Sequence, residues 1–386
     1  MDVARASVAL PGSVSEVREF GVPPAGPDTG WLRVAASGIC GTDVSLYARG
    51  LPAPTVLGHH VVGRIAEVGE EAAARWGVQP GDRVALEEYL PCGNCRECAR
   101  GRYRLCPDTD LWGGGRRIGT VPAAELPSLH GGNSQFTFLP PNAVLHRLPP
   151  ELPEDLAAWV LPYANAIDWT TGAGRMRDGE NVVVLGPGYH GLAVAAAALA
   201  QGAARVVVTG LARDAARLGY AAALGAATVI AGGGDSAGEK DNSNKQIGGA
   251  LAGEPADLVV DTTGADGGVL GPAAELLGHG GRLILTTPKN PARVPFDTAA
   301  MTRRNLTVSA VRGRAPEAIA RAINSLADGS SRLERVPTIE VPLEETGDML
   351  SRLAAGTGPE SPHVVVRPSA DAPISPARTD KEEASC

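Results

Sequence analysis

The stretch ENVVVLGPGYHGLAVAAAALAQGAARVVVTG, residues 180–210, decides the fold of this chain. An uninterrupted apolar run at 181–185 is followed by a glycine turn, an alanine-rich segment and a second apolar run at 205–210. Strands buried on both faces have this character, and a helix between two of them makes a parallel βαβ unit. The stretch therefore predicts a doubly wound α/β domain. Further apolar runs that fit strands of the same sheet lie at 227–231, 257–264 and 282–287.

The turn inside this stretch carries Gly186, Gly188 and Gly191 in the spacing G-x-G-x-x-G. Glycines at these places let the backbone approach a pyrophosphate, and the helix that follows points its N-terminus at the phosphates. The strand before the turn and the helix after it supply the context that the motif requires. We therefore expect a bound dinucleotide here, with Tyr189 and His190 beside it. The alternative is a glycine turn with a structural role only.

The end of the second strand bears on the choice between NAD and NADP. An acidic residue that binds the ribose 2′-hydroxyl commonly stands there, whereas this chain has Thr209 and Gly210. Arg213 and Arg217 follow, and a small residue near arginines leaves room and charge for a 2′-phosphate. The sequence therefore favours NADP slightly. Asp214 keeps NAD open, and the two arginines could instead belong to a solvated helix face.

Four of the six cysteines fall within residues 92–106, in the pattern C-x2-C-x2-C-x7-C. They are Cys92, Cys95, Cys98 and Cys106. Short C-x2-C turns can point thiolates at one tetrahedral centre, so the loop predicts a zinc site. No catalytic base is near and no ligand position is left open, which indicates a structural ion. Four reduced thiols without metal, or an iron–sulfur cluster, are the alternatives.

Size and composition limit the broad class of the protein. A chain of 386 residues exceeds what one hydrophobic core usually supports, so two domains are expected. The net charge of −8 and the absence of a long uncharged apolar run argue against nucleic acid and membrane as partners. No secretory signal is recognisable at the N-terminus, so a cytoplasmic location is expected. The segment 369–386, rich in Pro, Ser, Ala and charge, is predicted to be disordered.

Four motifs occur in a fixed order: GICGTD at 38–43, GHH at 58–60, the cysteine loop at 92–106, and GPGYHG at 186–191. Together they resemble the zinc-dependent medium-chain dehydrogenase/reductase family, which includes alcohol, sorbitol and threonine dehydrogenases. The resemblance runs from about residue 30 to residue 367. It implies an α/β fold in which a β-rich, GroES-like catalytic domain is interrupted in sequence by a Rossmann domain, with the active site in the cleft between them.

The resemblance also places the domain bounds. The catalytic domain would comprise residues 1–155 and, after the chain returns, residues 316–368. The Rossmann domain would comprise residues 156–315. Members of the family commonly form dimers or tetramers, and RNLTVSAVRG at 304–313 resembles the edge strand that pairs across such dimers. A homo-oligomer is therefore expected.

Carried over position by position, the resemblance implies that Cys40 and His59 bind a catalytic zinc ion. Thr42 would be the hydroxyl that accepts the proton of the substrate alcohol. Asp43 would hold His59 and fix the tautomer of its ring. Zinc favours loss of that proton, and hydride then passes to the nicotinamide. Ser45 stands where a proton-relaying histidine is often found.

The chain departs from the family pattern at the other expected ligand positions. His60 stands where Glu normally follows the first histidine, Leu161 where another Glu ligand would be, and Asn165 at about the position of a Cys ligand. Leucine cannot bind zinc and asparagine is a poor ligand. If a catalytic zinc is bound, Cys40, His59 and His60 are the natural ligands, with water as the fourth. The alternative is that His60 points away from the metal.

The leading hypothesis is therefore a zinc-dependent oxidoreductase that transfers a hydride between NAD(P) and a secondary alcohol, polyol or sugar-like substrate. Asn165 and Asp168 are a weak indication of a hydroxyl-rich substrate. A second hypothesis is an NADPH-dependent reductase of activated C=C or iminium bonds without catalytic zinc. A third is a dinucleotide-binding protein that is not an enzyme.

Overall fold

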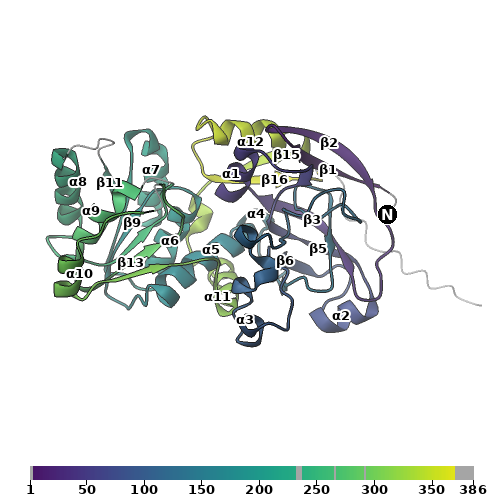
Figure 1. Cartoon of the computed structure of the whole chain (residues 1–386), viewed down its shortest axis with the longest axis horizontal. Helices are drawn as coiled ribbons and strands as arrows, with labels where there is room; N and C mark the ends of the chain where they lie inside the picture. The colour runs from purple at the N-terminus through teal and green to yellow at the C-terminus, as the bar shows by residue number, and fades with distance from the viewer. Residues whose placement is uncertain (1–2, 232–236, 265–266, 291–292, 370–386) are drawn as a thin grey trace, which may run out of the picture.

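The computed structural model describes residues 3–231, 237–264, 267–290 and 293–369, with backbone only at 237–241. Two parts lie side by side along the long axis: a β-rich part built around β3 and β5, and a part built around a parallel sheet (Figure 1). The predicted α/β fold class, with a β-rich part and a parallel-sheet part, is confirmed. The predicted disorder of the tail concerns residues that, from 370 on, lie outside the described part of the chain.

The parallel sheet has the strand order β11-β10-β9-β12-β13-β14. Its bounds are β9 Asn181–Leu185, β10 Arg205–Gly210, β11 Ala227–Ile230, β12 Ala256–Asp261, β13 Leu277–Leu285 and β14 Thr307–Ala310. Valines 182–184 of the central strand are fully buried, as the continuous apolar run predicts. The chain leaves β9 on one side for β10 and later returns on the other side with β12. A crevice at the carboxyl ends of these two strands is where open α/β sheets bind ligands.

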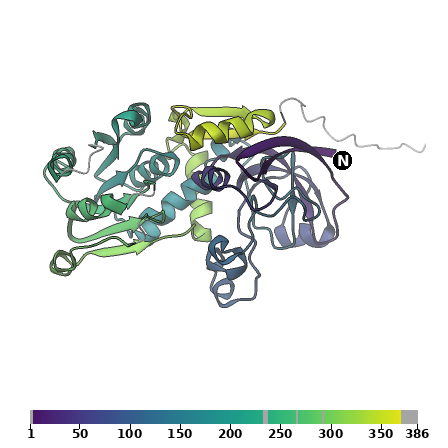
Figure 2. The same cartoon turned by 45° about the horizontal axis from the view of Figure 1, so that its top comes forward.

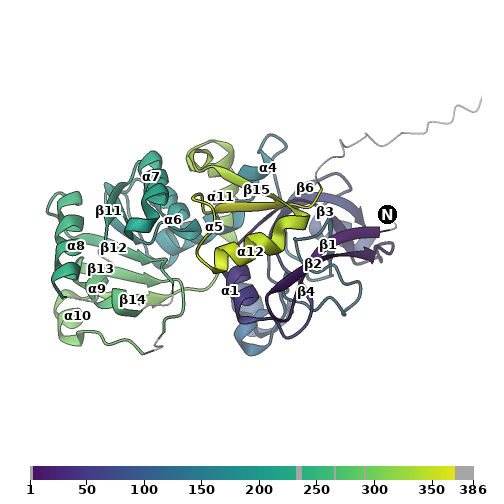
Figure 3. The same ribbon diagram turned by 90° about the horizontal axis from the view of Figure 1, so that it is seen from above.

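Helices cover both faces of this sheet (Figure 3). They are α6 Tyr189–Ala200, α7 Ala215–Leu224, α8 Ala237–Ala250, α9 Leu270–Glu275 and α10 Thr298–Arg304, with short 3-10 turns at Ala212–Asp214 and Gly267–Val269. In α6, every residue from 191 to 198 is buried. The small alanine side chains allow this helix to pack closely on the strands, which sets the position of the turn at its N-terminus.

The β-rich part contains two sheets. One has the order β15-β16-β3-β5-β6-β8, with β7 also paired to β3, and the other has the order β2-β1-β4. Their bounds are β1 Val3–Leu10, β2 Val14–Gly21, β3 Gly30–Gly38, β4 Thr55–Val56, β5 His60–Val68, β6 Arg83–Leu86, β7 Phe136–Leu139, β8 Leu145–Arg147, β15 Thr338–Pro342 and β16 His363–Arg367. Because β16 pairs with β3, the chain returns to this part after the parallel sheet. The exact domain bounds stay a prediction.

Helices also flank and join the two parts. Those on the β-rich part are α1 Gly41–Arg49, α2 Glu70–Trp76, α3 Arg96–Ala99 and α12 Thr346–Ala354; those at the junction are α4 Glu154–Ala157, α5 Val160–Ile167 and α11 Pro316–Ala327. Further short 3-10 turns are Tyr103–Leu105, Pro107–Thr109, Leu111–Gly113, Leu333–Arg335 and Leu343–Glu345, and a π-helical segment, Asp168–Ala173, follows α5. Figure 2 shows α5 and α11 between the two parts.

Helix α5 is buried along its whole length and contacts both α6 and α11. One hydrophobic cluster extends from Val62 and Val365 of the β-rich part to Val182 of the parallel sheet. The two parts therefore share a continuous core, and residues from both can form one site. No helix within the described ranges is both long enough and apolar enough to span a bilayer.

Candidate active site

Cys40, His59 and His60 come together where β3 ends and β5 begins. Strand pairing places Gly38 opposite His60, so the residue that caps α1, Cys40, lies beside the two histidines. The Cys40 Sγ and one ring nitrogen from each histidine all lie within 4.8 Å of one another. All three residues are buried. The structure thus brings together the three side chains that the sequence suggested as catalytic metal ligands.

Asp43, in the first turn of α1, forms hydrogen bonds to two members of this cluster. Its Oδ1 accepts a hydrogen bond from His59 Nδ1 at 3.0 Å, and its Oδ2 accepts one from the backbone N–H of Cys40 at 2.9 Å. Burial disfavours a charged His59, but the Asp43 carboxylate outweighs burial and raises the pKa of His59 well above its usual value. Because Nδ1 is engaged by Asp43, Nε2 of His59 is the ring nitrogen left for a metal. Thr42 Oγ1 lies 3.9 Å from Cys40 Sγ.

His60 has a buried ring nitrogen without a hydrogen-bond partner. Among the described residues, nothing bonds to its Nδ1. Burial, and then the neighbouring His59, lower the pKa of His60 well below its usual value, so the ring is neutral. A buried polar atom without a partner is costly unless something is bound to it. A neutral imidazole, a second imidazole held by a carboxylate and a thiol are a donor set that fits zinc.

The cysteine loop lies between β6 and β7 and forms a second cluster. The Sγ atoms of Cys92, Cys95, Cys98 and Cys106 all lie within 4.8 Å of one another. Backbone N–H groups donate to two of the sulfurs: Cys98 N–H to Cys95 Sγ at 3.5 Å, and Cys92 N–H to Cys106 Sγ at 3.4 Å. Such hydrogen bonds favour thiolates. Four convergent sulfurs fit a closed, tetrahedral zinc site.

The glycine turn follows β9 and precedes α6 as predicted. Gly186 has a positive φ of +93°, and a Cβ on Gly191 would lie 1.9 Å from the carbonyl oxygen of Gly186. A Cβ on Gly188, in contrast, would meet no protein atom within 4 Å. The backbone at Gly188 is therefore open to an approaching ligand. Thr262 Oγ1 donates to the carbonyl oxygens of Leu185 and Gly186, which ties the end of β12 to the turn. This cradle fits a pyrophosphate.

The residues after β10 are arranged in a way that the sequence did not reveal. The Asp214 carboxylate accepts a hydrogen bond from the backbone N–H of Leu211 at 2.9 Å, so it is engaged with its own loop. Arg217 lies 3.9 Å from Asp214 and donates to the carbonyl oxygen of Glu360. Arg213 is exposed, and its guanidinium has no partner within the described part of the chain.

A buried ion cluster beside the site was missed by sequence reasoning. Arg314, between β14 and α11, is fully buried and donates to Glu88 at 2.6 Å and to Glu87 at 2.9 Å. Burial alone would raise the pKa of Glu88, but Arg314 overrides this and lowers the pKa to about 2. The Tyr103 hydroxyl and His146 Nε2 bond to Glu87 as well. The one available signal was a pair of acidic residues directly after an apolar strand.

Asn165 and His190 connect this cluster to Cys40, His59 and His60. Asn165 Oδ1 accepts a hydrogen bond from Arg314 at 3.2 Å, and Asn165 Nδ2 lies 3.4 Å from His190 Nε2. The His190 and His60 ring centroids are 6.2 Å apart. Burial, and then His59, lower the pKa of His190 to about 4.

Among the other residues that the sequence singled out, Tyr189 lies against the cluster: its ring centroid is 5.8 Å from that of His60 and 5.6 Å from that of His190. Tyr189 is buried, and its hydroxyl donates to the Ala158 carbonyl oxygen rather than facing the turn. Leu161 is part of the hydrophobic core. Ser45 is exposed on α1. Asp168 lies 4.0 Å from Arg104, and burial raises the pKa of its carboxyl.

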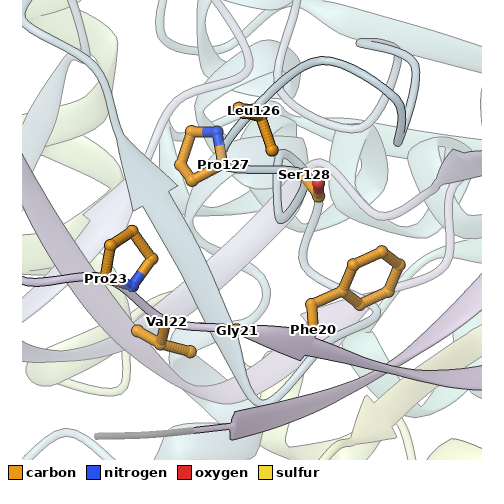
Figure 4. A pocket seen from close by; sticks show the side chains of 7 residues that line it. All are labelled: Phe20, Gly21, Val22, Pro23, Leu126, Pro127 and Ser128. Atoms are coloured by element: carbon orange, nitrogen blue, oxygen red, sulfur yellow. The ribbon is translucent and has the colours of Figure 1, made fainter.

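The surface also has a shallow groove of about 500 Å³ on the β-rich part (Figure 4). Its lining residues are Phe20, Gly21, Val22, Pro23, Leu126, Pro127 and Ser128. None of these can titrate near neutral pH or commonly binds a metal. This groove therefore offers no side chain suited to acid–base or metal chemistry.

Known families and proteins match most of this chain. Residues 26–150 match the alcohol dehydrogenase GroES-like domain, and residues 191–328 match the zinc-binding dehydrogenase domain. The Mycobacterium tuberculosis H37Rv protein named "Probable alcohol dehydrogenase adh" is 33% identical over 345 residues, which cover 88% of this chain and 91% of the relative. An erythritol/L-threitol dehydrogenase of Mycolicibacterium smegmatis is 32% identical over 260 residues, covering 64% of this chain and 66% of the relative.

Solved structures show the same architecture. The alcohol dehydrogenase TADH from Thermus sp. ATN1 superposes with a TM-score of 0.78 at 28% identity, covering 94% of this chain and 99% of that one. A zinc-binding dehydrogenase from Sinorhizobium meliloti 1021, bound to NADP, superposes with a TM-score of 0.79 at 25% identity, covering 95% and 100%. The extent of these matches, with both domains represented, shows that this chain belongs to the zinc-dependent medium-chain dehydrogenase/reductase family.

Proposed function

We propose that the protein oxidises a secondary alcohol or polyol to its ketone, and reduces the ketone in reverse, with NAD(P) as hydride carrier. The observation that carries this proposal is the convergence of Cys40, His59 and His60 within 4.8 Å, in a chain whose glycine turn is open at Gly188. The three-residue cluster and the glycine turn sit on elements that share one hydrophobic core. A dinucleotide at the turn and a substrate at the cluster would therefore meet between the two parts.

Cys40, His59 and His60 would hold the catalytic zinc, and the four loop cysteines would hold a structural zinc. A catalytic zinc acts as a Lewis acid that makes a substrate hydroxyl more acidic. Asp43 keeps His59 in the tautomer that presents Nε2. Thr42, two residues after Cys40 and 3.9 Å from its sulfur, would relay the proton released by the substrate hydroxyl: its oxygen would accept that proton while its own hydroxyl proton passes to solvent, to which Thr42 is exposed.

NADP is the slightly favoured cofactor. The support is Arg213, an exposed guanidinium near the end of β10 for which the described residues offer no partner. Asp214, the acid that would otherwise bind a ribose 2′-hydroxyl, is engaged with the backbone of Leu211. Arg213, rather than Arg217, would therefore meet the 2′-phosphate.

The substrate class follows from the polar surroundings of the cluster and from the relatives. Asn165 and His190 lie next to Cys40, His59 and His60, and polar side chains of this kind suit a substrate with more than one hydroxyl group. The relatives include proteins named as dehydrogenases of erythritol and L-threitol and of L-threonine.

Assembly and location are part of the same proposal. Strand β14 stands at the edge of the parallel sheet, where a second copy could add its own β14, so a homo-oligomer is proposed. The proposed location is the cytoplasm. The partner is a small molecule, with no role for nucleic acid or membrane. The proposed domain bounds are 1–155 with 316–368, and 156–315.

The test combines zinc content with turnover. Elemental analysis should give about two zinc ions per chain in the parent protein, about one in Cys40→Ser and about one in Cys95→Ser. A panel of secondary alcohols and polyols, offered with NAD⁺ and NADP⁺, should show turnover in the parent and none in Cys40→Ser. Cys95→Ser is the matched control, since it removes a sulfur of the other cluster.

Two outcomes would contradict the proposal. One zinc ion in the parent and none in Cys95→Ser would mean that the histidine pair binds no metal. NADPH-dependent reduction of conjugated or iminium substrates that survives in Cys40→Ser would then identify a zinc-independent reductase. Tight dinucleotide binding without turnover of any alcohol or carbonyl compound would point to a protein that is not an enzyme.

A further inference from the structure

The orientation of the Asn165 amide is fixed by its neighbour. A guanidinium has only hydrogen-bond donors, so Arg314, at 3.2 Å, must face the amide oxygen. Arg314 itself cannot rotate away, because it is fully buried and donates to the carboxylates of both Glu87 and Glu88. The amide nitrogen of Asn165 therefore points in the opposite direction, toward His190.

This orientation determines the tautomer of His190. Asn165 Nδ2 lies 3.4 Å from His190 Nε2, and an amide nitrogen can only donate. His190 Nε2 must then accept, which requires a lone pair on that nitrogen. A neutral imidazole that lacks a proton on Nε2 carries its proton on Nδ1.

The proton on Nδ1 has no acceptor among the residues that the structure describes. No described residue bonds to His190 Nδ1, and this atom is not among the fully buried atoms that lack a partner. His190 is only partly buried, in the first turn of α6 directly after Gly188. Its ring lies 6.2 Å from that of His60 on one side and 5.1 Å from that of Trp169 on the other. The free N–H therefore belongs to the wall between the glycine turn and the cluster of Cys40, His59 and His60.

We propose that His190 donates a hydrogen bond through Nδ1–H to an uncharged oxygen atom of the bound ligand, and that Asn165 and Arg314 are positioning residues that fix this donor. The proposal rests on the proposed function, because it takes the glycine turn as the dinucleotide site. It assigns His190 a binding role that goes beyond its place in the glycine motif.

Two sources could supply the oxygen. A dinucleotide with its pyrophosphate at Gly188 and its reactive end at Cys40, His59 and His60 would pass His190 with its nicotinamide half, which carries carboxamide and ribose oxygens. A polyol would instead offer a hydroxyl group beside the reacting carbon. The recognised chemistry, a neutral oxygen acceptor, is the same in both cases, and the experiment separates them.

The tautomer can be measured directly in the zinc-loaded protein without any substrate. Nitrogen NMR of ¹⁵N-histidine-labelled protein at neutral pH, with His190 assigned from the signal that His190→Phe lacks, should show a protonated Nδ1 and an unprotonated Nε2. In Asn165→Asp, a carboxylate of the same shape accepts instead of donating, so His190 Nε2 should gain a proton. A protonated Nε2 in the parent, or an unprotonated Nε2 in Asn165→Asp, would overturn the proposal.

The bound oxygen is located by comparing two variants of His190. His190→Phe keeps a ring but removes the donor, whereas His190→Asn keeps a donor near the position of Nδ1. Loss of one hydrogen bond to a neutral acceptor should weaken binding about 2- to 12-fold in His190→Phe, and His190→Asn should recover most of it. Fluorescence titration with NADPH and NADH measures the Kd of each cofactor, and steady-state kinetics at saturating cofactor measure the KM of the alcohol.

Each pattern of results has one meaning. A raised Kd for the cofactor in His190→Phe, restored in His190→Asn, places the oxygen on the nicotinamide half. A raised KM with an unchanged cofactor Kd, again restored in His190→Asn, places it on the alcohol. If neither quantity changes in His190→Phe, His190 is not a donor to the ligand. If the parent turns over no alcohol, the proposed function fails, while the NMR and cofactor measurements still decide the role of His190.

Discussion

Replacing Arg314 by methionine should destabilise the protein strongly. Arg314 is fully buried and is the shared ion-pair partner of Glu87 and Glu88, which are themselves buried. Methionine fills much of the same volume without a charge, so the variant removes the cation that both buried carboxylates share, although Glu87 keeps its hydrogen bonds with Tyr103 and His146. Breaking a buried ion pair from one side in this way typically costs about 3–5 kcal/mol.

The pKa of Glu88 gives an independent magnitude. Its value falls from an ordinary 4.5 to about 2 in the folded protein, and each pKa unit corresponds to about 1.4 kcal/mol, so the pairing contributes on the order of 3 kcal/mol. Because the folded pKa is the lower one, this stability is present above about pH 4.5 and is lost as the pH falls toward 2. The difference between parent and variant should therefore be largest at neutral pH and should shrink below pH 4.

Urea unfolding, followed by tryptophan fluorescence and circular dichroism at pH 7.5 and pH 3.5, measures this difference. Arg312→Met is the matched control: it removes an arginine two residues away whose partner, Asp110, is partly exposed, and such pairs contribute about 0.2–1 kcal/mol. If Arg314→Met loses no more stability at pH 7.5 than Arg312→Met does, or if its deficit is the same at both pH values, the reasoning from the buried ion cluster is refuted.

Four further substitutions test the cofactor and metal sites. Gly188→Ala should fold with the stability of the parent yet bind NADPH about tenfold or more weakly, because its Cβ would occupy only the open cradle of the ligand. Gly191→Ala should lose stability as well, since its Cβ would lie 1.9 Å from a carbonyl oxygen. Equal unfolding curves for the two variants would contradict this difference. Arg213→Ala should weaken NADP about tenfold while leaving NAD unchanged in fluorescence titrations, whereas equal losses for both cofactors would remove the 2′-phosphate role. His60→Glu should shift the pH profile of alcohol oxidation upward by about one unit, because an added negative charge makes the substrate hydroxyl less acidic; an unshifted profile in a variant that retains its zinc would exclude His60 as a ligand.

The local patterns of the chain predicted a large part of the fold and of the candidate site. The apolar run at 181–185, the glycine spacing that follows it and the next apolar run at 205–210 are short-range features, and they led to a strand, a turn, a helix and a parallel strand. The four-cysteine spacing is equally local, and its sulfurs do converge. The order of the motifs was enough to predict the family and, through it, the cluster of Cys40, His59 and His60.

Other features depend on which distant residues meet, and no local pattern encodes them. Arg217 has the residue type of a 2′-phosphate ligand, but the fold engages it with the carbonyl oxygen of Glu360, 143 residues away, and leaves Arg213 free among the described residues. Tyr189 lies within the glycine motif, yet the helix turns its hydroxyl toward the Ala158 carbonyl oxygen in the junction between the two parts.

The sequence by itself determined the βαβ unit, the glycine turn and the four-cysteine loop, because periodicity and spacing act over a few residues. The resemblance to a family then supplied Cys40, His59 and His60 as candidate ligands. Only the tertiary structure decided how Arg314 meets Asn165 and Glu88, which are 149 and 226 residues away along the chain. The packing of the two parts on one core buries these groups together, and burial makes each of them need a partner. That need orients Asn165, and through it His190, at the wall of the site.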